Sequence, residues 1–368
     1  MKILTIVGAR PQFIKASVVS AEILKHKGIQ EIIVHTGQHF DDKMSEVFFN
    51  QLNIPRPKYT LNINQLSHGA MTGRMMEEIE KIIIAEQPDF VMVYGDTNST
   101  LAGALAAKKL DAKVVHIEAG LRSFNMKMPE EINRILTDRI SDILFCPTDT
   151  AVNNLKNEGY DQFNCQIEKN GDVMYDACLF FKEFAIKPDI ILPETFALAT
   201  IHRAENTDDI DNLSNIFASF LKISETIPIV IPLHPRTIQL IEKYQINITS
   251  PNLFVLPPVS YLEMLYLLDS CKFVLTDSGG LQKEAYFLKK LCLTLRNETE
   301  WVELIAQKAN IIVGNSEASI LNAFNEIDNL FLEANFEKEL YGSGDASGRI
   351  IDSLEKLVLK EKLMVNPV

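Results

Sequence analysis

The 368-residue sequence has few cysteines, fewer basic than acidic residues and no long apolar run. Its five cysteines include no Cys-x-x-Cys pair, which argues against a zinc ribbon and a thioredoxin-type site. A sparse and odd set of cysteines is typical of reduced thiols, so we expect a cytoplasmic protein. No run approaches the roughly 18 apolar residues of a membrane-spanning helix. The start, MKILTIVG, has too short an apolar stretch for a signal peptide, and we expect none.

The shortage of basic residues limits the ligands that the protein can bind. Thirty-six Lys and Arg residues against 49 Asp and Glu residues give a net charge of −13. A general nucleic-acid binder needs a basic face, so we expect no nucleic acid as partner. A small phosphorylated ligand in a local basic pocket is still compatible with this charge. The apolar fraction of 46% and the length predict a globular protein of two domains.

Short apolar runs alternate with amphipathic stretches along the whole chain. The runs begin with KILTIVG (2–8), and residues 11–27 after it have the apolar spacing of a helix. Continuous apolar strands separated by helices predict parallel sheets that are covered on both faces. We therefore predict an α/β fold with two doubly wound, Rossmann-like domains that face each other across a cleft. The other expected strands are 31–37, 89–96, 113–120, 142–148, 196–202, 228–234, 253–258, 273–278, 291–296 and 310–314.

The alternation pauses near residues 164–195, where NCQIEKNGDVMYDA reads as a crossing between domains. We expect an N-terminal domain over residues 1–171 and a C-terminal domain over 172–345. Residues 346–363 read as a last helix, and the segment 346–368 is expected to pack back on the N-terminal domain. Ligands of doubly wound sheets bind beyond the carboxyl ends of the strands, so the polar residues at those ends are the candidates for function.

The first strand ends in Gly8-Ala9-Arg10-Pro11, and a helix follows directly. Arg10 and, one helical turn later, Lys15 lie where they favour an anion at the helix N-terminus. A solvated loop arginine and a solvated helix lysine explain this pattern equally well. The segment is not Gly-x-Gly-x-x-Gly, so it gives no support for dinucleotide binding.

Two later strands end in carboxylates. Asp96 in YGDTNST reads either as a cap of the helix that follows or as a carboxylate of the cleft, and spacing alone favours the cap. His116 and Glu118 share one face of their strand, where a buried parallel strand should be apolar. An ion pair of Glu118 with Arg122 is the structural alternative to a catalytic Glu118. Glu131 lies in the first turn of the next helix, where the helix dipole favours a carboxylate.

In the second half of the chain, two strands end in a histidine that has an arginine nearby. His202 and Arg203 close one strand, and His234 closes the next. A metal is one reading of the histidines, but the arginines would repel a cation. Further on, Ser278-Gly279-Gly280 lies between a strand and a helix, where backbone N–H groups can bind an anion. A common strand–helix turn with glycines is the alternative. Glu284 lies one turn into that helix, and Arg296 ends the next strand.

A set of these motifs, in this order, resembles the non-hydrolysing UDP-N-acetylglucosamine 2-epimerases. The motifs are GARPQFIK, HTGQH, YGDTNST, HIEAGLRS, PEEINR, HRAEN, HPR and TDSGGLQKEA, and they span nearly the whole chain. The resemblance implies the two-domain glycosyltransferase-B architecture and a UDP-sugar substrate. It also implies a homodimer and no metal, NAD or other cofactor. The implied reaction eliminates UDP across C1–C2 to a glucal and adds it back after protonation of C2 from the other face.

The resemblance divides the candidate residues into two groups. UDP is expected at Ser278, Gly279, Gly280, Glu284 and His202, and the chemistry around Arg10, Lys15, Asp96, Glu118 and Glu131. Which carboxylate is the base and which the acid stays open. Our catalytic candidates are therefore Asp96, Glu118, Glu131 and His202. Our substrate-binding candidates are Arg10, Lys15, His39, Arg122, Arg203, His234, Ser278, Gly279, Gly280, Glu284 and Arg296.

Two departures from the family pattern point to a branch with a different sugar. Trp301 stands where many members have the arginine of T-E-R-P-E, and residues 38–44 read QHFDDKM where QHREM is associated with an activating second UDP-N-acetylglucosamine. Both resemble the branch that acts on UDP-2,3-diacetamido-2,3-dideoxy-D-glucuronate to make the manno epimer for O-antigen or capsule. We expect no regulatory nucleotide-sugar site of the usual kind. UDP-N-acetylglucosamine 2-epimerase, a UDP-sugar glycosyltransferase, a hydrolysing epimerase and a binding regulator are the alternatives.

Overall fold

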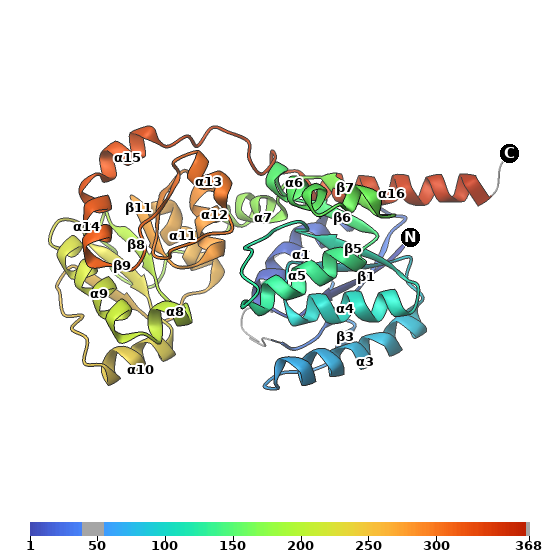
Figure 1. The fold of residues 1–368 in the computed structure, drawn as a ribbon, viewed down its shortest axis with the longest axis horizontal. Coiled ribbons are helices and arrows are strands. Elements are labelled where there is room, and N and C mark those ends of the chain that lie inside the picture. Colours follow the sequence, from blue (N-terminus) through green and yellow to red (C-terminus); the bar gives the residue numbers. More distant parts are fainter. Residues whose placement is uncertain (39–54, 366–368) are drawn as a thin grey trace. The chain divides into compact units, whose positions relative to one another are not determined.

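A computed structural model gives the fold, and it describes residues 1–38 and 55–365 (Figure 1). The chain forms two compact units, one of residues 1–177 with 339–368 and one of residues 178–338. Each unit is built on one parallel sheet, which confirms the predicted α/β class with two doubly wound sheets. The domain limits expected from the sequence, after residues 171 and 345, stay predictions of where each part folds by itself.

The first unit contains a seven-stranded sheet in the order β3-β2-β1-β4-β5-β6-β7. All the strand pairs in this sheet are parallel. Its strands are β1 (Lys2–Val7), β2 (Gln30–His35), β3 (Tyr59–Thr60), β4 (Phe90–Tyr94), β5 (Lys113–Ile117), β6 (Ile143–Cys146) and β7 (Gln166–Lys169). Its helices are α1 (Arg10–Ile23), α3 (His68–Glu86), α4 (Asn98–Lys109), α5 (Pro129–Ile140), α6 (Asp149–Asn157), the 3-10 turn η1 (Tyr160–Gln162), α7 (Val173–Lys182), which runs into the second unit, and α16 (Ala346–Val365).

The core of the first unit follows from the apolar strands. Residues on both faces of β1 are buried, as expected for a sheet that is covered on both sides. On one face, Ile79 of α3 and Ala102 of α4 pack against Leu4 and Val91 of the strands. Small residues along α4 let it lie close to the sheet: a Cβ at Gly103 would come within 3.1 Å of the Val93 side chain.

Helix α16 belongs to the first unit although it ends the chain, and it packs against α1 (Figure 1). Its start is fastened by a distant carboxylate, because Asp176 accepts hydrogen bonds from the backbone N–H groups of Ala346 (3.1 Å) and Ser347 (2.8 Å). The Ser347 hydroxyl donates to the same carboxylate at 2.6 Å. Asp176 therefore caps a helix that begins 170 residues later, and this contact holds the C-terminal segment in place.

The second unit contains a six-stranded sheet in the order β10-β9-β8-β11-β12-β13. Phe217 and Phe220 of α9 pack with Ile229, Leu275 and other buried strand residues to form its core. Its strands are β8 (Ala197–Thr200), β9 (Ile229–Pro232), β10 (Leu253–Leu256), β11 (Phe273–Thr276), β12 (Leu291–Thr294) and β13 (Asn310–Ile312). Its helices are α8 (Ala204–Thr207), α9 (Ile210–Ser224), α10 (Pro235–Lys243), α11 (Tyr261–Ser270), α12 (Gly279–Phe287), α13 (Val302–Ala306), α14 (Glu317–Asn325) and α15 (Ile327–Glu333).

The predicted strands are present, and two short strands, β3 and β7, were not predicted. The stretch 164–177, read as a crossing, contains β7 and the start of α7. The polar strand QIEK of β7 lies at the edge of its sheet and is only half-buried, so it lacks the apolar run by which the other strands are recognised. Among the described residues, none of the helices combines the length and the hydropathy needed to cross a membrane.

In both sheets the strand order reverses next to a loop that the sequence analysis marked. The reversal falls between β1 and β4 in the first unit and between β8 and β11 in the second. Ligands of open parallel sheets bind beyond the carboxyl ends of the strands at such a reversal. The loops after β1 and β4 and those after β8 and β11 are therefore where the fold positions a site.

We expect Asp176→Ala to lower the free energy of unfolding by about 1–3 kcal/mol, because it leaves three donors at the start of α16 without their acceptor. Urea unfolding followed by circular dichroism measures this. Asp149→Ala is the control, since Asp149 is exposed and its ion pair with Lys169 lies at the surface. Equal losses in the two variants would contradict the capping role.

Candidate active site

The loop after β1 is fixed by a glutamine and by a glycine. A Cβ at Gly8 would collide with the hydroxyls of Thr36 and Ser99, so only glycine fits there. The Gln12 carbonyl oxygen accepts hydrogen bonds from the N–H groups of Gly8 (2.9 Å) and Ala9 (3.0 Å). Its amide nitrogen donates to the carbonyl oxygen of Tyr94 at 2.8 Å. Gln12 thus fastens the start of α1 to the end of β4 and sets the position of Lys15 one turn later.

Lys15 and Glu118 form an ion pair whose two side chains are nearly buried. They come from α1 and from the residue that follows β5, and they meet above Gly95. A Cβ at Gly95 would lie 3.3 Å from Glu118 Oε2 and 3.6 Å from Lys15 Nζ, and the φ of Gly95 is +62°. Glycine at this position therefore satisfies the turn and leaves the ion pair without a side chain over it.

Glu118 has a left-handed backbone, with φ of +70°. A non-glycine residue in this region is unfavourable, and the neighbouring structure has to hold it there. The buried Asp138 stabilises this backbone conformation. Its carboxylate contacts His116 Nδ1 at 2.7 Å and accepts a hydrogen bond from the N–H of Gly120 at 3.1 Å. Arg122 donates to the same carboxylate at 2.7 Å. Asp138 thus ties down residues on both sides of Glu118.

Burial alone would raise the pKa of Asp138, but the hydrogen bonds and charges of His116 and Arg122 bring it below its ordinary value. Arg122 also pairs with Glu158 at 2.7 Å and is 5% exposed. The alternative of a Glu118–Arg122 ion pair is therefore wrong. The structure places Arg122 in this buried network, and a role of Arg122 in substrate binding stays a prediction.

Asp96 is not the helix cap that its spacing favoured. Thr97 caps α4 by accepting from the N–H of Thr100 at 3.3 Å, while Asp96 forms an ion pair with Arg134 of α5. Asp96 lies between the end of β4 and the cap of α4, and it is half-exposed there. Its carboxylate is therefore available to a ligand as well as to Arg134.

Glu131 is fully buried, in contrast to Asp96 and Glu118. Its carboxylate accepts from the N–H groups of Ser123 and Phe124, each at 2.9 Å, and from the Ser123 hydroxyl. Arg134 lies 3.0 Å from the same carboxylate. In this structure Glu131 holds the loop between β5 and α5, and its catalytic role stays a prediction.

A cavity of about 250 Å³ lies at the carboxyl ends of β1 and β4 in the first unit. It is lined by Lys15, Gly95 and Asp96, which the sequence marked, and by polar residues that it did not mark. Those residues are Gln12, Gln38, His68, Thr97, Asn98, Glu130 and Asn133. The cavity thus combines an ammonium group, the carboxylates of Asp96 and Glu130 and amide groups, which suits a polar ligand such as a sugar with acetamido groups.

In the second unit, the buried Asp277 ties the end of β11 to the end of β8. Its carboxylate accepts from the N–H groups of His202 (3.1 Å) and Arg203 (3.0 Å) and from the Asn206 amide at 3.2 Å. His202 keeps an exposed side chain, with Nδ1 3.2 Å from Asp277. Asp277 therefore brings His202 and Arg203 to the loop that contains the two glycines.

The Ser-Gly-Gly turn opens helix α12. Ser278 is the cap and accepts from the N–H of Leu281 at 3.4 Å, while little lies near the Cα of Gly280. The carboxylate of Glu300 lies against Gly279, 3.0 Å from Arg296 and 4.0 Å from Arg203. Burial alone would raise the pKa of Glu300, but Arg296 and Arg203 lower it. Two guanidinium groups therefore lie close to the turn, and Glu300 is their carboxylate partner there.

Three of the remaining candidates lie in a helix or at its start. Glu284 is buried in α12, one turn after the glycines, and Arg10 begins α1. His234 caps α10 by accepting from the N–H of Arg236 at 3.2 Å, which gives it a structural use. His39 and the segment Phe40–Met44, on which the expected lack of a regulatory site rests, lie outside the described residues.

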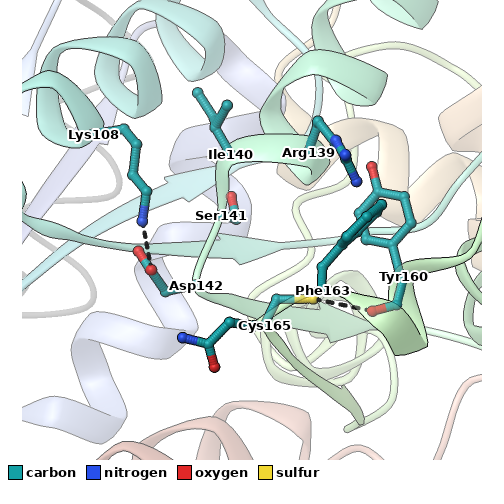
Figure 2. A pocket seen from close by; sticks show the side chains of 9 residues that line it. Lys108, Arg139, Ile140, Ser141, Asp142, Tyr160, Phe163 and Cys165 are labelled. Atoms are coloured by element: carbon teal, nitrogen blue, oxygen red, sulfur yellow. Dashed lines mark hydrogen bonds and ion pairs between the residues drawn. The ribbon is translucent and has the colours of Figure 1, made fainter.

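A second pocket, of about 260 Å³, lies at the opposite end of the strands of the first sheet (Figure 2). Its charged side chains are engaged with neighbours: Lys108 pairs with Asp142 at 2.6 Å, and the Arg139 guanidinium lies 3.3 Å from the centre of the Phe163 ring. Asp142 directly precedes β6, so this pocket is at the amino ends of the strands. Parallel sheets bind ligands at the other end, and the candidate site is therefore the cavity at Lys15 and Asp96. Within residues 1–38 and 55–365 there is no group of His, Cys, Asp and Glu suited to hold a metal ion.

The comparisons with known proteins fit this geometry. The family model described as UDP-N-acetylglucosamine 2-epimerase matches residues 21–355. The chain is 55% identical to the UDP-2,3-diacetamido-2,3-dideoxy-D-glucuronate 2-epimerase of Pseudomonas aeruginosa, over 97% of this chain and the whole relative. A structure of the Methanocaldococcus jannaschii UDP-GlcNAc 2-epimerase with UDP-GlcNAc and UDP matches with a TM-score of 0.86 and 40% identity, over 97% of this chain and 100% of that chain. The Neisseria meningitidis UDP-GlcNAc 2-epimerase bound to UDP-GlcNAc matches at 0.87 and 32% identity, again over 97% and 100%.

We expect Asp138→Asn to lower the free energy of unfolding at neutral pH by about 3–5 kcal/mol, because it removes the fully buried partner charge of Arg122 and leaves that guanidinium paired with the partly exposed Glu158. The pKa of Asp138 is lower in the folded chain than in the unfolded one. Its contribution is therefore present above about pH 3.9 and is lost as the pH falls through the folded value. Urea titrations between neutral and acid pH measure both effects. A variant as stable as Asp149→Asn at every pH would contradict the assignment.

Proposed function

The chain belongs to the UDP-N-acetylglucosamine 2-epimerase family, and we propose that it inverts C2 of UDP-2,3-diacetamido-2,3-dideoxy-D-glucuronate. The observation that carries this substrate is the 55% identity, over 97% of the chain, to the Pseudomonas aeruginosa enzyme of that name. UDP-N-acetylglucosamine is the alternative, since relatives at 40–43% identity are named for it and one at 52% is named a homolog of that epimerase.

The reaction needs a base at C2 and stabilisation of a leaving anion. The base takes the C2 proton, the C–H electron pair becomes the C1–C2 double bond, and the C1–O bond breaks as UDP leaves. A proton then reaches C2 from the opposite face and UDP adds back to C1. No other reactant is consumed, so the net change is inversion at C2. Carboxylates move the protons well when they are aimed at C2 and partly shielded from water.

Glu118 and Asp96 are the carboxylates that we assign to proton transfer. Glu118 forms an ion pair with Lys15, and the carboxylate of such a pair is the acceptor that a base needs. Asp96 lines the cavity together with Lys15, the partner of Glu118, and is half-exposed. Glu131 already accepts four hydrogen bonds, and we assign it a positioning role through the loop at Ser123. Lys15 and Arg10 offer positive charge near the reacting sugar.

We assign the nucleotide to the loops after β8 and β11 of the second unit. The N–H groups of Gly279 and Gly280, with Arg203 and Arg296, supply donors and charge for the diphosphate. Glu284 is a carboxylate in the same helix, suited to accept from ribose hydroxyls. His202 has an exposed side chain next to this turn. This assignment needs neither a metal nor a redox cofactor.

We also propose a homodimer that works in the cytoplasm to supply a surface polysaccharide. A dimer is supported by apolar side chains that α5 exposes one turn apart, Ile132 and Leu136. Five thiols without a disulfide support a reducing compartment. The polysaccharide role follows the resemblance to the diacetamido-glucuronate branch. Sedimentation of the pure protein tests the dimer.

Incubation of the pure protein with each nucleotide sugar, followed by NMR, tests the proposed reaction. We expect the manno epimer of the diacetamido-glucuronate nucleotide, without any acceptor and without release of free sugar. A much higher rate with UDP-N-acetylglucosamine would assign the alternative substrate. Release of free sugar would indicate a hydrolysing enzyme. Sugar transfer that occurs only with an acceptor would indicate a glycosyltransferase, and no reaction with any nucleotide sugar would indicate a binding protein.

We expect Glu118→Gln to reduce turnover by about 10²–10⁴-fold with UDP affinity largely kept, because glutamine keeps the shape but cannot take the proton. Initial rates and UDP calorimetry measure the two effects. Glu78→Gln, at an exposed pair with Lys81, is the control. Normal turnover by a folded Glu118→Gln variant would leave Glu118 with a structural role only.

We expect Glu284→Ala to weaken UDP binding by about 1–3 kcal/mol, because a buried charged hydrogen-bond partner is lost. Calorimetric titration with UDP measures this without any turnover. Glu317→Ala, at a surface pair with Lys222, is the matched control in the same unit. An unchanged affinity would remove Glu284 from the nucleotide site.

A further inference from the structure

His68 lines the cavity of Lys15, Gly95 and Asp96, yet the proposed mechanism does not use it. It is the first residue of α3, and its side chain is exposed at the cavity. A histidine ring offers either a donor or an acceptor at each nitrogen, depending on where its proton lies. The contacts around His68 decide which of these it presents.

The orientation of Asn133 starts a chain of fixed hydrogen bonds. Its amide group lies 2.9 Å from the carbonyl oxygen of Asp96. A carbonyl oxygen only accepts, so the Asn133 atom that faces it is the nitrogen. The same nitrogen lies 3.3 Å from the side chain of Asn98, and the Asn98 atom that faces it is therefore the oxygen.

The orientation of Asn98 then fixes the proton of His68. With its oxygen toward Asn133, Asn98 presents its amide nitrogen to His68 Nδ1 at 3.1 Å, while its oxygen is farther from that atom, at 3.4 Å. An amide nitrogen only donates, so Nδ1 accepts and the ring proton lies on Nε2. His68 is thus held with a donor at Nε2, and Nδ1 is occupied.

We propose that His68 contacts the substrate, donating from Nε2 to an acceptor oxygen that a substituent of the sugar brings into this cavity. This inference rests on the proposed function, because it assumes that the sugar occupies the cavity. The proposed sugar has two such substituents that UDP-N-acetylglucosamine lacks, a carboxylate and a second acetamido group. A donor that bonds to one of these substituents favours the acidic sugar. A substrate without the acceptor leaves the Nε2–H group without a hydrogen-bond partner on the sugar.

Two amide variants separate the two ring nitrogens. In His68→Gln the amide nitrogen reaches about as far as Nε2, whereas in His68→Asn it reaches only as far as Nδ1. For the diacetamido-glucuronate nucleotide we expect His68→Asn and His68→Ala to lower kcat/KM by about 10–100-fold, mainly through KM, and His68→Gln to restore most of it. Affinity for UDP alone should not change. His26→Asn, three residues after the end of α1, is the control.

The substrates separate the two acceptors. A loss with UDP-2-acetamido-2-deoxy-glucuronate as well as with the diacetamido sugar assigns the carboxylate as the partner of His68. A loss with the diacetamido sugar alone assigns the second acetamido group. The inference would be overturned, while the proposed function stands, if wild type, His68→Asn and His68→Gln had equal kcat/KM with the diacetamido sugar, with UDP-2-acetamido-2-deoxy-glucuronate and with UDP-N-acetylglucosamine.

A measurement without turnover separates failure of this inference from failure of the proposed function. In protein with ¹⁵N-labelled histidine, the ring-nitrogen shifts of His68 should show Nε2 protonated and Nδ1 not, and they should move on binding the acidic nucleotide sugar. If no sugar is epimerised but this shift occurs, the function is wrong and the contact stands. A proton on Nδ1, or no shift at saturating ligand, would overturn the contact.

Discussion

The ion pair of Lys15 and Glu118 is the interaction on which the site of the first unit depends. Two opposite charges that are nearly buried stay there only if each holds the other, so α1 and the end of β5 are fixed relative to each other. The chain makes room for the pair with Gly95, which has no Cβ to cover it, and accepts an unfavourable left-handed backbone at Glu118. Strain and burial at one carboxylate, beside a cavity, indicate a chemical use for it.

Buried carboxylates hold the loops that carry the candidate residues. Asp138 and Glu131 fasten the segment after β5 on both sides, through Gly120 and Ser123. Asp277 does the same in the second unit for His202 and Arg203. Each accepts from backbone N–H groups that no strand or helix could satisfy at these turns, so the acids replace regular hydrogen bonding where the chain leaves its sheet. The exposed acids beside them, such as Asp96, remain available for chemistry.

The sequence predicted the sheets well because their strands are buried on both faces and therefore read as continuous apolar runs. It missed β3, which has two residues, and β7, a polar edge strand whose pattern carries no such signal. Motif order marked the loops after β1 and β4, which line the cavity, but it did not assign a role to each acid. The ion-pair partners of Glu118 and Arg122 could not be assigned from the sequence, because neither partner is a close neighbour along the chain. Lys15, the partner of Glu118, is 103 residues away, and Asp138, a partner of Arg122, lies in another element. The spacing of Glu131 and Arg134 was readable as a helical pair, whereas Asn133, Asn98 and His68 join only through the packing of α3, α4 and α5.

The central claim is that Glu118, beside Lys15, moves the proton at C2 of the sugar. The most direct test is the uptake of deuterium at C2 of the nucleotide sugar in heavy water, followed by NMR in substrate and product. The account predicts one deuterium at C2 and none elsewhere on the ring, with uptake lost in Glu118→Gln at saturating nucleotide sugar. Epimerisation without deuterium at C2, or unchanged uptake in that variant, would contradict it.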